Sequence, residues 1–131
     1  MRLEHEPGAG LLARTAVREL LAAHPTTDEL RHDAALVVYE LILNAVVHGQ
    51  PQPDGRITLS CEVVDGQLVV VVTDGGAEGA RAVGDLDQEA DRGRGLAIVD
   101  ALTSSWSVDR SQGTTVRAVM PLQWPDDRAG R

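Results

Sequence analysis

A strand–turn–strand pattern between residues 56 and 72 determines the fold class more firmly than any other stretch of this chain. Arg56–Val64 alternates apolar and polar residues, as expected of a strand with one buried face. Asp65-Gly66 follows, a dipeptide that strongly favours a two-residue turn between antiparallel strands. Leu68–Val72 is an unbroken apolar run, typical of a central strand. The chain is therefore expected to build an antiparallel sheet with at least one covered face.

Two segments before this hairpin have helical periodicity. The first, Leu11–Ala23, ends before Pro25. Its expected apolar stripe is Leu12, Ala16, Leu20 and Ala23. The second begins at a cap on Thr26 or Thr27 and runs to about Val47, with an apolar stripe wide enough to predict a central helix.

The remaining segments complete an α+β order. We expect a short strand at residues 2–6, a helix over 94–102 and a second hairpin made of strands 106–110 and 114–120. Residues 75–92 form a long loop rich in glycine, alanine and acids, and such a loop is usually functional or disordered. Hairpins separated by helices predict a two-layer α/β sandwich, with a mostly antiparallel mixed sheet packed against three helices.

Length and charge limit the function classes. The 131 residues suffice for one domain, expected over 1–122 with a polar tail at 123–131. The formal net charge of −8 opposes direct nucleic-acid binding, because it repels a phosphate backbone. Cys61, the single cysteine, excludes an internal disulfide and is expected to be a buried, inert thiol. No signal peptide and no apolar run of about 20 residues is found, so the expected location is the cytoplasm and not a membrane.

The predicted central helix carries a polar row that can bind a metal. Glu40, Asn44 and His48 follow one another at intervals of four residues and therefore share one face. An amide oxygen at Asn44 suits Mg²⁺, and a carboxylate one turn away can orient or deprotonate a hydroxyl near the metal. A solvated polar stripe explains the same spacing. His48, in the last turn, can instead interact with the helix C-terminus.

Two glycine-containing segments can bind a nucleotide. Asp74 ends the apolar strand before two glycines, where a carboxylate can accept the amino group of adenine; an ordinary turn explains the same residues. At residues 92–96, a Gly-x-Gly sequence with two arginines opens a helix, and free amides at a helix start attract phosphate. Thr114 or Thr115 can bond the adenine edge, although both also fit plain strand preference.

The order and spacing of these segments are more specific than any one of them. The segments are Glu40-x-x-x-Asn44-Ala45-x-x-His48-Gly49, Asp74-Gly75-Gly76, Gly93-Arg94-Gly95-Leu96 and Gly113-Thr114. Together they resemble the GHKL ATPase superfamily, whose members share the Bergerat ATP-binding fold. The resemblance covers residues from about 10 to 121 and is closest to the branch of bacterial anti-sigma factors with serine/threonine kinase activity.

The resemblance implies ATP and Mg²⁺ as cofactors and assigns roles by position. Glu40 would be the catalytic base, and Asn44 would hold the metal. The implied nucleotide-binding residues are Asn44, His48, Asp74, Gly76, Arg92, Gly93, Arg94, Gly95, Leu96, Thr114 and Thr115. Residues 77–92 would be the ATP lid. Glu78 departs from the pattern because the family often has a glycine there.

The same resemblance implies a regulatory protein kinase. Such a protein phosphorylates an anti-anti-sigma-type antagonist, sequesters a sigma factor and forms a homodimer. One alternative is a non-catalytic ATP-binding module that acts only through protein contacts. A histidine kinase ATPase domain is another, but His24 and His32 do not lie in a segment suited to accept the phosphoryl group.

Overall fold

The computed structural model describes residues 1–76 and 95–122 of the chain. Their strands and longer helices are β1 (Arg2–Glu4), α1 (Ala9–Ala22), α2 (Asp28–His48), β2 (Arg56–Val64), β3 (Gln67–Asp74), β4 (Ser105–Asp109) and β5 (Thr114–Pro121). Residues 95–102 form a further helix. The predicted tail at 123–131 lies outside the described residues.

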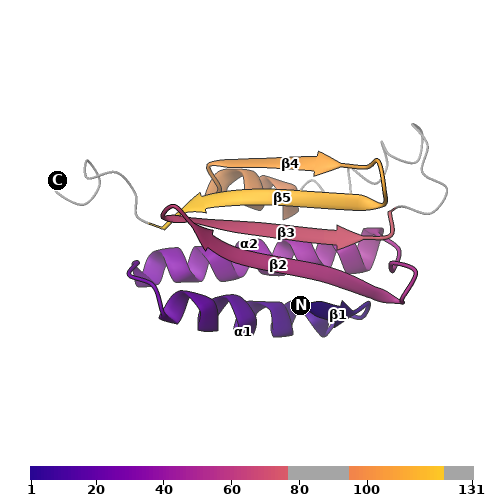
Figure 1. Ribbon diagram of the computed structural model, residues 1–131, viewed down its shortest axis with the longest axis horizontal. Helices are drawn as coiled ribbons and strands as arrows, with labels where there is room; N and C mark the ends of the chain where they lie inside the picture. Colours follow the sequence, from indigo (N-terminus) through magenta and orange to yellow (C-terminus); the bar gives the residue numbers. More distant parts are fainter. Residues whose placement is uncertain (77–94, 123–131) are drawn as a thin grey trace.

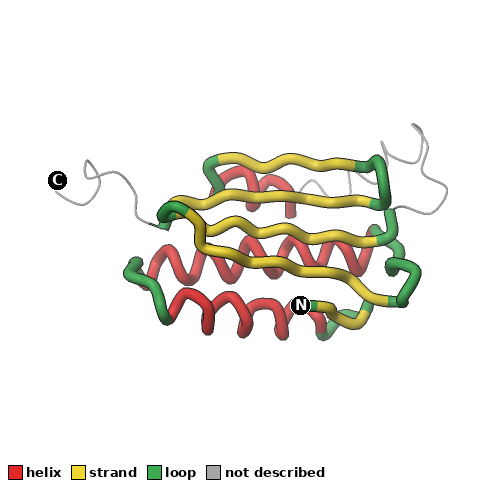
Figure 2. Tube along the Cα trace, viewed as in Figure 1, coloured by secondary structure: helices red, strands yellow, loops and turns green. Residues whose placement is uncertain are grey.

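The strands form one sheet in the order β1-β2-β3-β5-β4, and every described pair is antiparallel. The helices lie together on one face of this sheet (Figures 1 and 2). The predicted two-layer α+β sandwich with three helices is therefore confirmed. The sheet differs in one detail, because the expected mixed pairing is absent from the described strands.

The hairpin between β2 and β3 forms as the sequence predicts. Asp65 and Gly66 both have positive φ angles, 52° and 74°, as a two-residue turn of the favoured type requires. The turn pairs Val64 with Gln67 and sets a continuous register down to Thr58 opposite Thr73. In this sheet β3 ends at Asp74, which pairs with Thr114 of β5.

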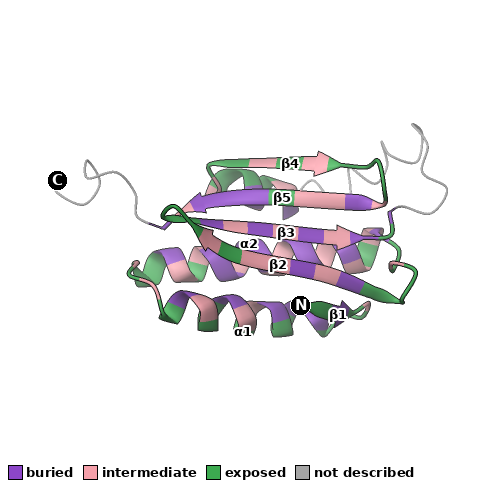
Figure 3. Cartoon of the chain, viewed as in Figure 1, coloured by how far each residue is buried: buried purple, intermediate pink, exposed green. Residues whose placement is uncertain are grey.

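Helix α2 is the central helix of the covered face. Thr27 caps it, since its side-chain oxygen accepts a hydrogen bond of 3.0 Å from the Leu30 amide. Buried residues recur along its length: Leu30, Ala34, Ala35, Val37, Val38, Leu41, Ile42 and Ala45. They join the apolar side chains of β2, β3 and β5 in one core, and the buried bands on the strands are visible in Figure 3.

Helix α1 forms, but the prediction of which of its residues are buried was wrong. The helix begins at Ala9, two residues before the predicted start, and buries Ala13, Val17 and Leu21. Leu12 is 57% exposed, and the buried positions are shifted by one residue from the predicted ones. Among the described helices, none is long and apolar enough to cross a bilayer.

Candidate functional site

The centre of the candidate site is the last half of α2, where Glu40 and Asn44 lie one turn apart. They contact the start of the helix over residues 95–102. A methyl group built on Gly95 would lie 3.0 Å from Oε1 of Glu40 and 3.4 Å from both Nδ2 and Oδ1 of Asn44. A side chain at residue 95 would crowd these groups, so glycine favours the close approach of the helix start to both side chains. Residues far apart in the sequence thus converge here.

The Asn44 amide has an unfilled hydrogen-bonding position. Its Nδ2 atom is buried, and no described residue accepts a hydrogen bond from it. Buried polar atoms are almost always hydrogen-bonded, so an exception indicates a binding function or strain. Rotation of the amide exchanges Nδ2 and Oδ1, so the same position can present an oxygen. A ligand that occupies this side of Asn44 would complete its bonding.

Asp74 is held at the end of β3 by the loop that follows α2. The carboxylate is 5% exposed and accepts a hydrogen bond of 2.6 Å from the Gly76 amide. The Gly75 amide donates to the Gln50 carbonyl, and the Gln50 amide donates to the Gly76 carbonyl, both at 2.7 Å. A Cβ on Gly49 would lie 2.3 Å from Oδ2 of Asp74, so this position must be glycine for the carboxylate to fit.

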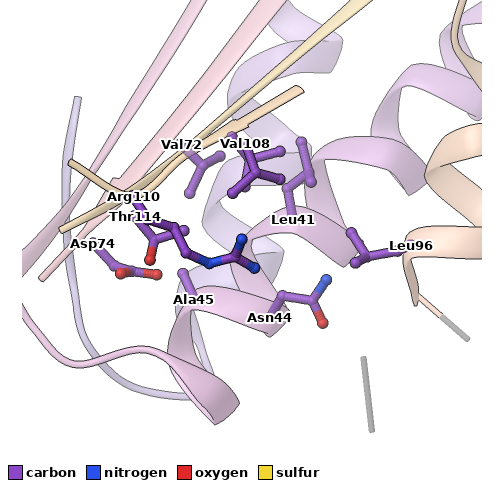
Figure 4. A pocket seen from close by; sticks show the side chains of 10 residues that line it. Leu41, Asn44, Ala45, Val72, Asp74, Leu96, Val108, Arg110 and Thr114 are labelled. Atoms are coloured by element: carbon purple, nitrogen blue, oxygen red, sulfur yellow. The ribbon is translucent and has the colours of Figure 1, made fainter. Parts of the chain in front are cut away.

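Asp74 and Asn44 line one cavity between the helices and the sheet (Figure 4). Its lining residues are Leu41, Asn44, Ala45, Val72, Asp74, Leu96, Val108, Arg110, Thr114 and Val116. The apolar members form walls suited to a flat aromatic base, and the few polar members can fix its orientation. In this form the cavity holds about 20 Å³, enough for one water molecule.

The predicted catalytic and nucleotide-binding residues that the structure describes lie at different positions relative to the cavity. Asn44, Asp74, Leu96 and Thr114 line the cavity. Glu40, Gly95 and Gly76 lie next to it, the last with a φ of 94° that allows close contact with Gly113. His48 is in the last turn of α2 and is not a lining residue.

Strand alternation decides between the two threonines that the sequence left open. Thr114 is 5% exposed and lines the cavity, whereas Thr115 points to the opposite face of the sheet. There its hydroxyl lies 3.2 Å from the hydroxyl of Thr73 on the neighbouring strand. Thr115 is therefore not brought into the site.

Part of the predicted site is outside the described residues. Arg92, Gly93 and Arg94, the predicted lid over 77–92, and Glu78 within it all lie there. In the described part of the Gly-x-Gly segment, Gly95 lies against Glu40 and Asn44, and Leu96 lines the cavity.

Arg110 was missed by the sequence-based interpretation. It follows β4 and supplies the only cation among the described residues that line the cavity. The apolar walls contributed by Val72, Val108 and Val116 were also not singled out. Knowledge of the strand register could have revealed Arg110. Asp109 pairs with Thr115, so the next residue, Arg110, comes next to Thr114 on the neighbouring strand.

Mg²⁺ can be accommodated at Asn44 without an all-protein cage. No group of three or more histidine, cysteine or acidic side chains that could hold a metal is found in residues 1–76 and 95–122. Mg²⁺ is commonly held by one or two protein oxygens together with substrate phosphates and water. The buried, incompletely bonded amide of Asn44 beside the Glu40 carboxylate fits that mode of binding.

An antiparallel sheet covered by helices on one face, with a part-polar cavity between a central helix and two strand ends, defines a small ligand-binding α+β domain. The family comparison is more specific. Residues 4–120 match the model of the histidine kinase-like ATPase domain. The match covers most of the chain, so the chain belongs to this family, and its predicted place in the GHKL superfamily is confirmed.

Individual relatives agree with this assignment. Over 66 residues, the chain is 36% identical to the anti-sigma F factors of two Clostridium botulinum strains, Eklund 17B and Alaska E43. The aligned part is 49% of this chain and 46% of those proteins, so the chain spans about half the length of these relatives.

Solved structures share the fold. One is the crystal structure of the RsbU and RsbW domains of Rv1364c from Mycobacterium tuberculosis, with a TM-score of 0.72 and 24% identity over 95% of this chain and 33% of that one. Another is the histidine kinase domain of the blue-light activated histidine kinase EL346 from Erythrobacter litoralis. It has a TM-score of 0.52 and 21% identity, over 88% of this chain and 60% of that one.

Proposed function

We propose that the chain binds ATP with Mg²⁺ and transfers the γ-phosphoryl group to a serine or threonine of a protein antagonist. The observation that carries this proposal is the convergence of Glu40, Asn44 and Gly95 at one end of a cavity whose other end holds Asp74 and Thr114. Asp74 would accept the adenine amino group, and Asn44 would hold the metal. Bound Mg²⁺ would neutralise charge on the phosphates, as phosphoryl transfer requires.

Glu40 lines a second surface, whose lining residues are all different from those of the cavity. A groove of about 360 Å³ between α1 and α2 is lined by Arg14, Arg18, His32, Ala35, Leu36, Tyr39 and Glu40. Glu40 thus lines this groove and also lies against Gly95, next to the proposed nucleotide cavity, so a protein hydroxyl that enters the groove can approach it. In this position Glu40 would orient the hydroxyl and accept its proton.

The test of catalysis is transfer of labelled phosphate from ATP to a cognate antagonist protein. We expect the wild-type chain to transfer and Glu40→Gln, which keeps the size of the side chain, to lose about 100-fold or more, the usual value of a positioned base. Both proteins should bind ATP with similar affinity in calorimetry. Transfer by Glu40→Gln at the wild-type rate would show that Glu40 is not the base. ATP binding without transfer to any antagonist would favour the non-catalytic module.

The regulatory half of the proposal concerns protein partners. The anti-sigma F factors that the chain is similar to support an anti-sigma role for it, with a sigma factor and its antagonist as partners. A homodimer as the working form and the cytoplasm as location are further parts of the proposal that these relatives' names do not address. Recovery of a sigma factor with the tagged chain in the presence of ATP would support this role. Retention of only unrelated proteins would contradict it.

A further inference from the structure

Arg110 lines the cavity, but the proposed function gives it no role. The register pairs Asp74 with Thr114 and Asp109 with Thr115, so Arg110 continues the row that Asp74 and Thr114 begin across adjacent strands. Its side chain extends from the turn between β4 and β5 across the cavity toward Asn44 (Figure 4). Arg110 therefore spans the distance from the expected adenine end to the expected phosphate end.

The distribution of charge in the site indicates what kind of group Arg110 can bind. Among the described lining residues, Asp74 is the single acid and Arg110 the single base. The chain as a whole carries a net charge of −8, which opposes the approach of a polyanion. A triphosphate in this cavity needs a local positive charge, and a guanidinium offers several donors arranged to bind phosphate oxygens.

The size of the cavity shows that it must widen before a nucleotide can enter. About 20 Å³ is far too little for a base and sugar. Arg110 is exposed and follows β4 at a turn, so a change of its side-chain rotamer is one movement that would widen the cavity and leave the core in place. From the same Cα position it can then lie along the phosphates.

We propose that Arg110 is a further nucleotide-contacting residue, whose guanidinium binds the phosphates of ATP from the sheet side of the cavity. This inference rests on the proposed ATP binding. It adds a phosphate contact from the β4–β5 turn to those predicted at the start of the helix over 95–102.

The experiment is calorimetry of the full chain with MgATP and with adenosine, for wild type, Arg110→Ala and Arg117→Ala. Arg117 is a matched control, because it lies on β5, is exposed on the opposite face of the sheet and changes the net charge equally. We expect Arg110→Ala to weaken MgATP binding about ten- to a hundredfold, the range for lost charge-assisted hydrogen bonds, with adenosine affinity unchanged. Arg117→Ala should behave as wild type, and Arg110→Lys should recover part of the loss.

Two results would overturn the inference. Wild-type or tighter MgATP binding by Arg110→Ala would mean that the guanidinium only obstructs the cavity. An equal loss for adenosine would mean that it contacts the base instead. Absence of MgATP binding by the wild-type chain is a separate outcome, since it would contradict the proposed function itself.

Discussion

At the scale of single residues, the buried amide of Asn44 is the strongest indication that the site holds a ligand. A buried donor without a partner costs about 1–3 kcal/mol of stability, and proteins rarely retain that cost without a function. Asn44 lies against Glu40 and Gly95 and also lines the cavity. The expected metal site at Asn44 thus lies next to Glu40, the expected base.

Asn44→Ala separates this binding role from a structural one. Because Nδ2 is buried and has no partner among the described residues, its removal breaks no hydrogen bond there and relieves that cost, so the free energy of unfolding without ligand should stay the same or rise by up to about 1–3 kcal/mol. Affinity for ATP should fall at least tenfold in calorimetry with Mg²⁺ and change little with EDTA. An equal loss in both conditions, or a clear loss of stability by urea unfolding, would contradict the role as metal ligand.

The sequence predicted much of the site but not all of it. Glu40 and Asn44 were accessible because helical spacing places them on one face, and Asp74 because it ends an apolar strand before glycines. Arg110 was not, since a single arginine at a strand end is ordinary until the register of three strands is known. The choice of Thr114 over Thr115 likewise needed the register, because a shift by one residue reverses the face.

At the scale of elements, α1 shows where periodicity becomes ambiguous. It has leucines in adjacent pairs, Leu11-Leu12 and Leu20-Leu21, so two stripes one residue apart fit equally well. Contact with α2 decides between them. A methyl group on Gly10 would lie 2.8 Å from ring atoms of Tyr39, so the glycine lets α1 approach α2 on this face. This tertiary contact is not encoded in the local pattern, whereas the Asp65-Gly66 hairpin is.

A pair of identical substitutions on α1 tests the observed orientation. Leu21 is fully buried and Leu12 is 57% exposed. Leu21→Ala should lower the free energy of unfolding by about 2–5 kcal/mol, because it leaves a cavity in the core. Leu12→Ala should change it by about 0.5 kcal/mol or less. Urea unfolding of the two variants measures both values, and a loss for Leu12→Ala as large as that for Leu21→Ala would contradict the observed orientation.

At the scale of the whole molecule, the single thiol provides a reporter of global stability. Cys61 packs against the core from β2, and burial raises the pKa of its thiol from 9.0 to about 11. A pKa that is higher in the folded chain means that the stability linked to this group is complete below pH 9 and is lost as the pH rises toward 11. At pH 8 only about one thiol in a thousand is ionised in the folded chain, against about one in ten when unfolded. The folded chain should therefore resist alkylation.

Ligand binding at the cavity should protect this distant thiol. If alkylation at pH 8 proceeds mainly through opened molecules, a ligand that binds only the folded chain reduces their population by the factor 1 + [L]/Kd. MgATP at 100 times its Kd should then slow alkylation of Cys61 about 100-fold, whereas the same concentration should slow it about tenfold or less in Asn44→Ala, whose Kd is expected to be at least tenfold higher. Mass spectrometry of timed, quenched samples measures the rates. If the wild type is alkylated at the same rate with and without MgATP, then either no nucleotide binds or the β2 region opens independently of the site. Calorimetry on the same sample distinguishes these two explanations.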